Sequence, residues 1–269
     1  MTDVGLAGPL AGQVAIVTGA GSGIGRAASL ALADEGVTVV AADADEPSAH
    51  RTVAEISARQ PGGRALAVRC DVRREDDVEA LVARTLDECG GRVDALIACA
   101  GILRPKGSQP KPLAEVTSAE WDAVIGTNLR GLFLCNRAVL GPMIAQRHGH
   151  IVNLSSTSGR QGRALDAPYC ASKFGVIGLS EALAEEIRPY GVRLHIVLPD
   201  AVATPMWDQN GPIAAPADAL PPARVAEFIV YLLRLPEDTL LVSPIIAPFK
   251  TRRRIASRSP EGAVAATVK

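Results

Sequence analysis

A tyrosine and a lysine lie four residues apart in the segment APYCASKFGV, residues 167–176. Positions i and i+4 share a helix face, so the side chains of Tyr169 and Lys173 can be neighbours. A free phenol has a pKa of about 10 and is a poor base at neutral pH, but a neighbouring ammonium group lowers that pKa. The pair could therefore exchange a proton with a ligand. Alternatively, the tyrosine is a core residue and the lysine extends its aliphatic stem to reach water.

Three glycines, Gly19, Gly23 and Gly25, separate an apolar run from a segment with helical periodicity. Glycine lets the backbone turn tightly and approach a ligand without a Cβ. The following helix would offer unpaired N–H groups and its positive dipole end to a pyrophosphate. The spacing is G-x-x-x-G-x-G and not the common G-x-G-x-x-G, and a merely flexible turn is the alternative. The strand–loop–helix context favours a phosphate-binding loop.

Carboxylates end the next two apolar runs. Asp43 could accept both hydroxyls of an adenosine ribose and would repel a 2′-phosphate, which predicts NAD(H) over NADP(H). Neither Ser22 in the glycine loop nor Ala44 after Asp43 supplies a positive charge for such a phosphate. Asp43 could instead cap a helix. Asp71, at the end of the third run, is a candidate to bind the adenine amino group.

Short apolar runs rich in β-branched residues recur along the chain, as expected of strands buried on both faces. They span residues 13–19, 37–43, 65–71, 93–101, 150–156 and 192–199. Helical periodicity fills the intervals 25–36, 47–60, 75–90, 117–146 and 167–191, with a capping box at Thr117 and Glu120. This alternation predicts an α/β fold: a Rossmann-type, doubly wound parallel sheet of about seven strands flanked by helices on both faces. We expect a single domain over residues 1–250.

Two segments depart from the alternation of strands and helices. Residues 199–222 are rich in Pro, Ala and Asp and are too long for a routine connection, so we expect a substrate loop. A last helix at 221–234 and an apolar run at 239–248 follow. The basic stretch 251–269 predicts an unstructured tail, with anion or partner binding as the alternative.

The composition excludes several classes of protein. A net charge of −1 argues against a nucleic-acid partner. We expect no membrane association, because no apolar run has membrane-spanning length, and no secretory signal at the N-terminus. The five scattered cysteines form no C-x-x-C pair, which predicts a reduced, cytoplasmic protein. The four histidines lack metal-ligand spacing, so no metal site is expected.

In their order along the chain, these motifs resemble the short-chain dehydrogenase/reductase family over roughly residues 10–235. The resemblance rests on TGAGSGIG (18–25), DV (71–72), ACAG (98–101), TNLRG (127–131), IVNLSS (151–156), YCASK (169–173) and PDAVATPM (199–206). It implies a homo-oligomer, a tetramer or dimer, built through the helices that begin near 117 and 167.

The resemblance implies a catalytic group of Asn128, Ser156, Tyr169 and Lys173. Tyr169 would be the general acid/base, with its pKa lowered by Lys173 and by the positive ring of an oxidised nicotinamide. Ser156 would donate a hydrogen bond to the substrate oxygen. Lys173 would also bind the nicotinamide ribose, and Asn128 would hold a water that links Lys173 to solvent.

The predicted cofactor is NAD. Its expected contacts are Gly19, Ser22, Gly23, Ile24, Gly25, Asp43, Asp71, Val72, Ala100, Gly101, Tyr169, Lys173, Pro199, Val202 and Thr204. The chain departs from the family pattern in two places: Ala98 and Cys99 stand where it usually has two asparagines, and Asp200 stands where it favours glycine. The carboxylate of Asp200 could favour the oxidised ring or could point to solvent.

The leading hypothesis is an NAD(H)-dependent oxidoreductase that interconverts a secondary alcohol and its ketone. The loops 102–116 and 203–221 would line an apolar substrate pocket with Met206, Trp207 and Ile213, although Trp207 could equally be an exposed cap. The same chemistry with NADP(H) and a non-catalytic NAD(H)-binding sensor or scaffold remain alternatives. A sugar-nucleotide epimerase or dehydratase is disfavoured by the glycine spacing and by the lack of a substantial C-terminal domain.

Overall fold

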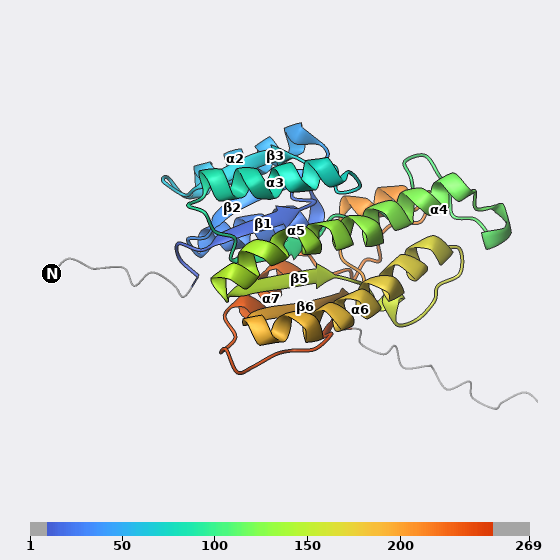
Figure 1. The fold of residues 1–269 in the computed structure, drawn as a ribbon. Coiled ribbons are helices and arrows are strands. Elements are labelled where there is room, and N and C mark those ends of the chain that lie inside the picture. Colours follow the sequence, from blue (N-terminus) through green and yellow to red (C-terminus); the bar gives the residue numbers. More distant parts are fainter. Residues whose placement is uncertain (1–9, 250–269) are drawn as a thin grey trace, which may run out of the picture.

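The apolar runs form one parallel sheet. The computed structural model describes residues 10–249, so the expected tail at 251–269 lies outside the described residues. The strand order is β3-β2-β1-β4-β5-β6-β7 (Figure 1). The strands are β1 (Val14–Thr18), β2 (Thr38–Asp43), β3 (Ala65–Arg69), β4 (Ala95–Ala98), β5 (Gly149–Leu154), β6 (Val192–Pro199) and β7 (Ile245–Ile246). The predicted strand positions are confirmed, and β7 is much shorter than the apolar run around it.

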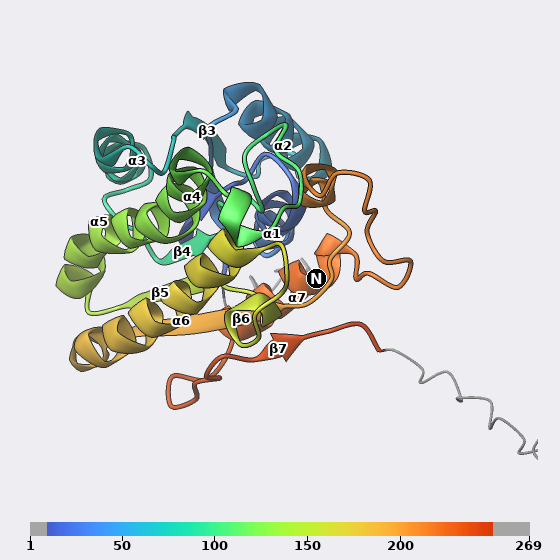
Figure 2. The same ribbon diagram turned by 90° about the vertical axis from the view of Figure 1, so that its right-hand side faces the viewer.

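Helices cover both faces of the sheet. They are α1 (Gly23–Asp34), α2 (Glu46–Arg59), α3 (Glu75–Glu88), α4 (Ser118–Ile125), α5 (Gly131–Gln146), α6 (Ala167–Ile187) and α7 (Pro222–Leu233). In Figure 2, α3, α5 and α6 lie on one side of the strands and α1 and α7 on the other. The predicted doubly wound fold in a single domain is confirmed.

Each face of the sheet has its own hydrophobic core, because successive side chains of a strand point to opposite sides. In β1, Val14 and Ile16 pack with residues of α3, α5 and α6. Ala15 and Val17 pack with residues of α1 and α7. Burial on both sides explains why these strands are apolar throughout. No helix within residues 10–249 is long and apolar enough to cross a bilayer.

The helix predicted over 117–146 is interrupted. The Thr117 hydroxyl accepts from the Glu120 N–H, and the Glu120 carboxylate accepts from the Thr117 N–H, so the predicted capping box is confirmed. After α4, however, residues Gly126–Arg130 form a π-helical turn before α5 begins. Such turns insert one extra residue and occur often at functional sites. Asn128 lies within this one.

The loop at 199–222 contains a short helix and is closed at its base. A 3₁₀ helix spans Pro205–Gln209. Val202 forms a bridge with Leu220, the Ala203 N–H donates to the Leu220 carbonyl (2.8 Å), and the Leu220 N–H donates to the Ala201 carbonyl (2.9 Å). The ends of the loop are therefore fixed together by backbone hydrogen bonds.

Candidate active site

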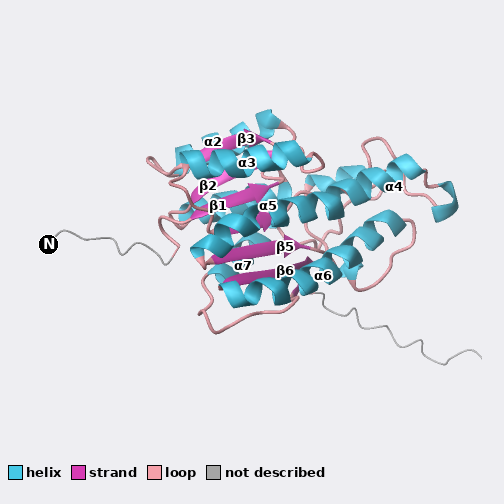
Figure 3. Ribbon diagram, in the orientation of Figure 1, coloured by secondary structure: helices cyan, strands magenta, loops and turns pink. Residues whose placement is uncertain are grey.

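A cavity of about 780 Å³ is lined by residues at the carboxyl ends of the strands and in the loops that follow them. Figure 3 colours these loops pink. Ligands of open parallel sheets bind at this edge, where the strand order reverses between β1 and β4. Every catalytic and cofactor residue predicted above lines the cavity except Asn128. The sequence motifs, which are scattered over about two thirds of the chain, therefore converge on one site.

The backbone of the glycine loop packs so closely against neighbouring backbone that a side chain at Gly19 or Gly25 would clash. Gly19 has a φ of +66°, and a Cβ there would lie 2.9 Å from the Ala100 nitrogen. At Gly25 a Cβ would lie 2.1 Å from the Gly19 carbonyl oxygen, so no larger residue fits without a shift of the backbone. Helix α1 starts at Gly23, after Ser22 in extended conformation. The first N–H groups of α1 thus open into the cavity, and the loop fits a pyrophosphate.

Asp43 is oriented by backbone donors at the end of β2. Its Oδ2 accepts from the Gly21 N–H (2.9 Å) and its Oδ1 accepts from the Asp45 N–H (2.9 Å). The N-cap of α2 is Asp45, so Asp43 is not the capping residue of that helix. Among residues 10–249, no arginine or lysine forms an ion pair with Asp43. A fixed negative charge therefore faces the adenosine side of the cavity.

The Asp71 carboxylate forms an ion pair with Arg73. Arg73 donates from Nε to Oδ1 (2.9 Å) and from Nη2 to Oδ2 (2.6 Å). These hydrogen bonds hold the pKa of Asp71 below its usual range. The carboxylate still lines the cavity, so any contact with an adenine would be shared with Arg73.

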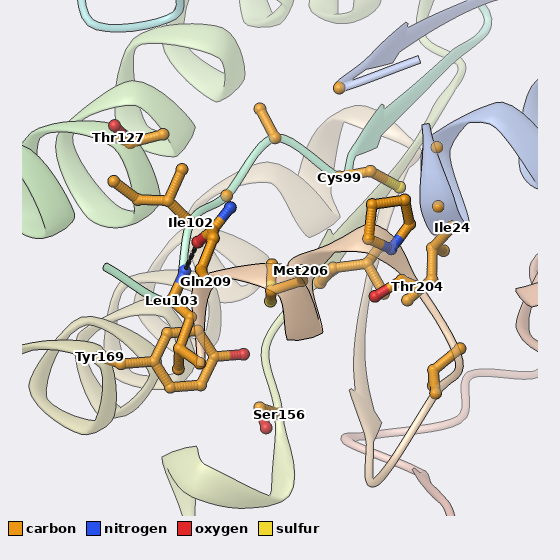
Figure 4. A pocket seen from close by; sticks show the side chains of 18 of the residues that line it. Ile24, Cys99, Ile102, Leu103, Thr127, Ser156, Tyr169, Thr204, Met206 and Gln209 are labelled. Atoms are coloured by element: carbon orange, nitrogen blue, oxygen red, sulfur yellow. Dashed lines mark hydrogen bonds between the residues drawn. The ribbon is translucent and has the colours of Figure 1, made fainter. Parts of the chain in front are cut away.

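Tyr169, Ser156 and Lys173 lie together. Tyr169 and Ser156 line the same cavity (Figure 4), and the Ser156 hydroxyl acts to lower the pKa of the Tyr169 phenol. The Lys173 Nζ lies 5.6 Å from the centre of the Tyr169 ring and donates to the Leu154 carbonyl (2.8 Å). The phenol, hydroxyl and ammonium thus meet where α6 passes the end of β5.

The direction of the Tyr169 pKa shift differs from the prediction. Burial raises the pKa of Tyr169 to about 12, with the Ser156 hydroxyl acting the other way. Burial also lowers the pKa of Lys173 to about 8. The expected lowering of the Tyr169 pKa is not produced by the protein groups alone, because loss of water around the phenol outweighs the effects of Ser156 and Arg163.

Asn128 does not line the cavity but hydrogen-bonds to residues next to it. Its Oδ1 accepts from the Ile102 N–H (2.8 Å), and its Nδ2 donates to the Ile102 carbonyl (2.8 Å) and to the Ser172 hydroxyl (3.1 Å). A Cβ on Gly101 would lie 3.3 Å from the Asn128 Oδ1 and 3.8 Å from the Lys173 Nζ. Asn128 therefore fixes the turn after β4 against α6, next to the lysine.

The two departures from the family pattern both border the cavity. Cys99 is a free thiol beside Lys173, and burial raises its pKa to about 12, which keeps it neutral. Asp200 accepts from the Thr157 hydroxyl (3.0 Å) and from Arg163 Nη2 (3.2 Å). Asp200 does not simply point to solvent. Its charge is paired with Arg163 at the rim.

The apolar wall was predicted in part. Met206 and Trp207 line the cavity, and the Trp207 indole N–H donates to the Val202 carbonyl (2.8 Å). Trp207 is therefore not an exposed cap. Ile213 is 51% exposed and does not line the cavity, so its prediction as a pocket residue was wrong.

A polar cluster was not predicted from the sequence: Asp166, Gln209 and Asn210 line the cavity, and Arg104 binds them from behind its wall. Arg104 is buried and binds residues from two other segments. Its partners lie 62 to 106 positions away along the chain. No local spacing could have signalled them, and only the isolated arginine in the apolar segment GILRP was visible.

Comparisons with known proteins agree with this geometry. The family model described as short chain dehydrogenase matches residues 13–213. The 3-oxoacyl-[acyl-carrier-protein] reductase of Synechocystis is 42% identical over 200 residues, which cover 74% of this chain and 78% of the relative.

Two solved structures share the fold. A metagenomic short-chain oxidoreductase in complex with NADP has a TM-score of 0.76 and 34% identity, covering 90% of this chain and 99% of the other. The 3-ketoacyl-(acyl-carrier-protein) reductase from Brucella melitensis complexed with NADH has a TM-score of 0.78 and 31% identity, covering 88% and 97%. The glycine loop, the sheet and these matches lead to one conclusion: the chain belongs to the short chain dehydrogenase family of oxidoreductases.

Proposed function

We propose that the protein is an NAD(H)-dependent oxidoreductase that interconverts a secondary alcohol and its ketone, with Tyr169 as the general acid/base. The observation that carries the proposal is that Tyr169, Ser156 and Lys173 line the cavity that the glycine loop also borders. A proton donor and a pyrophosphate loop in one cavity are what hydride transfer at a carbonyl carbon requires.

The side chains divide the work at the substrate oxygen. The nicotinamide ring, when bound, supplies or accepts the hydride. Ser156 donates a hydrogen bond to the carbonyl oxygen and holds it next to the phenol. Because its pKa is about 12, Tyr169 is protonated at neutral pH and can give its proton to that oxygen as the alkoxide forms. In the reverse direction the phenolate must form first, which positive charge close to Tyr169 favours.

Lys173 holds a fixed place behind this pair. Its ammonium donates to the Leu154 carbonyl at the end of β5, which leaves further N–H donors for a ribose hydroxyl. Asn128 keeps the turn after β4 in position through its two hydrogen bonds with the Ile102 backbone. These two residues orient the site, whereas Tyr169 and Ser156 contact the reacting oxygen.

Asp43 supports NAD(H) as the cofactor. Among the described residues Asp43 forms no ion pair, so a 2′-phosphate next to its carboxylate would meet a like charge, whereas two ribose hydroxyls could donate to it. Structural relatives have been solved in complex with NADP and with NADH. The choice of NAD(H) therefore rests on the Asp43 carboxylate and not on similarity to these proteins.

Cofactor binding and turnover test the proposal separately. Titration of the purified protein with NADH and NADPH, followed by nicotinamide fluorescence, should show at least about tenfold tighter binding of NADH, because its ribose hydroxyls donate to a charged acceptor and no phosphate is repelled. A panel of ketones should then oxidise NADH. Tighter binding of NADPH would contradict the cofactor assignment. NADH binding without turnover on any ketone or alcohol would favour the sensor or scaffold alternative.

A further inference from the structure

Arg104 is a buried cation whose guanidinium binds three residues that line the cavity, Asp166, Gln209 and Asn210. Arg104 is 7% exposed, and an arginine is seldom buried unless it forms an ion pair or hydrogen bonds. Its Nη1 donates to the Gln209 carbonyl (2.9 Å) and to the Asn210 Oδ1 (2.7 Å). Its Nη2 forms an ion pair with Asp166. One side chain thus joins the turn after β4, the tip of the loop at 199–222 and the residue before α6.

Gln209 binds the same segment in return. Its Oε1 accepts from the Leu103 N–H (2.8 Å) and from the Arg104 N–H (3.3 Å), and Figure 4 shows the first of these bonds. Because backbone N–H groups only donate, the orientation of the amide is unambiguous. Both the guanidinium and the backbone of the 103–104 segment therefore hold the same tip.

The base and the tip of the loop are held by different means. The base is closed by backbone hydrogen bonds of Ala201 and Ala203 with Leu220. The hydrogen bond from the Trp207 indole to the Val202 carbonyl lies within the loop. Within residues 10–249, the hydrogen bonds that leave segment 205–210 for another part of the fold all involve Leu103 or Arg104. The position of the tip over the cavity thus depends on them.

We propose that Arg104 is a positioning residue that latches segment 205–210 to the start of the catalytic helix α6. The latch sets the wall that Met206 and Gln209 present to the substrate, both of which line the cavity. The expected effect of the Arg104 latch on kinetics rests on the proposed function. Its expected effect on the position of segment 205–210 is independent of that function.

The ion pair also places charge near the general acid. Asp166 lies at the N-cap of α6, three residues before Tyr169, and its negative charge raises the pKa of Tyr169. Arg104 offsets that charge across the ion pair. A variant without the guanidinium should therefore shift the pH dependence of turnover to higher pH, a change that loss of packing alone would not produce.

Hydrogen exchange measured by mass spectrometry tests the latch without a substrate. In R104M, peptides that cover 205–210 should exchange at least about tenfold faster than in the wild type, with R104K between the two, because opening of this segment then loses its cross-links. The matched control is R160M, which removes an exposed arginine whose ion pair with Glu181 lies outside the cavity. If R104M does not fold, N210A removes one bond of the latch and should give a smaller increase.

Kinetics then test the consequence for catalysis. KM for the ketone should rise by about tenfold or more in R104M, with NADH affinity within about threefold of the wild type. Exchange at 205–210 equal to that of the wild type would overturn the proposal. So would faster exchange with unchanged KM, kcat and pH profile. Absence of turnover in the wild type would defeat the proposed function, while the exchange result would still decide whether the latch exists.

Discussion

At the scale of single residues, Asp43 and Tyr169 show what side-chain surroundings add to a motif. Asp43 is held by two backbone N–H groups, so its carboxylate keeps one orientation at the end of β2. A carboxylate that needs no reorganisation to meet a ligand binds donors more strongly than a mobile one.

Replacement of Asp43 tests the cofactor assignment. D43N keeps the shape of the side chain and an acceptor for the Gly21 N–H, but removes the charge. NADH affinity should fall by about tenfold and the preference over NADPH should shrink by at least as much, because ribose hydroxyls lose a charged acceptor and a 2′-phosphate loses a repulsion. Titrations of both dinucleotides check this. An unchanged NADH to NADPH ratio would refute the role of Asp43.

The candidate site was largely predictable at this scale, and its electrostatics were not. The spacing of Tyr169 and Lys173 predicts a shared helix face, and the resemblance to the family added Ser156. The raised pKa of Tyr169 could not be predicted, because it depends on how deeply the fold buries the phenol. Arg104 escaped notice for a related reason: its partners come from distant parts of the chain.

At the scale of elements, the strands were easy to predict. The helix at 117–146 was predicted as well, but its interruption after α4 was not. A strand buried on both faces is apolar at nearly every position, so β1 and β5 are readily recognised in the sequence. A π-helical turn adds one residue to a helix, and the weak helix formers in Gly126–Arg130 do not distinguish such a turn from a continuous α-helix.

Two glycines in helices make a matched test of the phosphate loop. A Cβ on Gly25 of α1 would lie 2.1 Å from the Gly19 carbonyl oxygen, whereas a Cβ on Gly178 of α6 meets nothing within 4 Å. G178A should raise the free energy of unfolding by about 0.5–1 kcal/mol through helix propensity. G25A should lower it and weaken NADH binding by at least about tenfold, because the loop must move. Urea unfolding and NADH titration measure both. Equal behaviour of the two variants would contradict the close packing of this loop.

At the scale of the whole molecule, two histidines on neighbouring strands couple stability to pH. His150 of β5 and His195 of β6 are buried with stacked rings 6.4 Å apart. Arg193 donates to the His150 Nε2 (2.8 Å), so that nitrogen must be unprotonated. Burial, with Arg193, His148 and His195 nearby, lowers the pKa of His150 to about 3, and burial lowers that of His195.

This pair should make the protein less stable in weak acid. Both histidines take up protons more readily in the unfolded chain than in the fold, so stability is greatest above about pH 6.5 and falls as pH drops toward the folded pKa values. For His150 the loss should approach about 1.4 kcal/mol per pH unit, and His195 adds to it in the same direction. Urea unfolding of the wild type and of H150Q between about pH 7 and pH 5 checks this, with a shallower slope expected for the variant. Identical slopes would contradict the contribution of His150.

The homo-oligomer stays a prediction. Phe133 of α5 and Phe174 of α6, which are 39% and 47% exposed, lie on the helices expected to form its contacts. We expect light scattering to give the mass of a dimer or tetramer, and F174E to reduce that mass because it places a charge in an apolar contact. A monomeric wild type would contradict the prediction.

The central claim is that the Tyr169 phenol passes a proton to or from the substrate oxygen next to a bound dinucleotide. The most direct test compares Y169F with Y190F, which alters an exposed tyrosine outside the cavity. For a ketone that the wild type reduces, Y169F should lower kcat by at least about 100-fold while NADH binds within about threefold of the wild type, and Y190F should change neither. Turnover retained in Y169F, or NADH binding lost in step with turnover, would contradict the account.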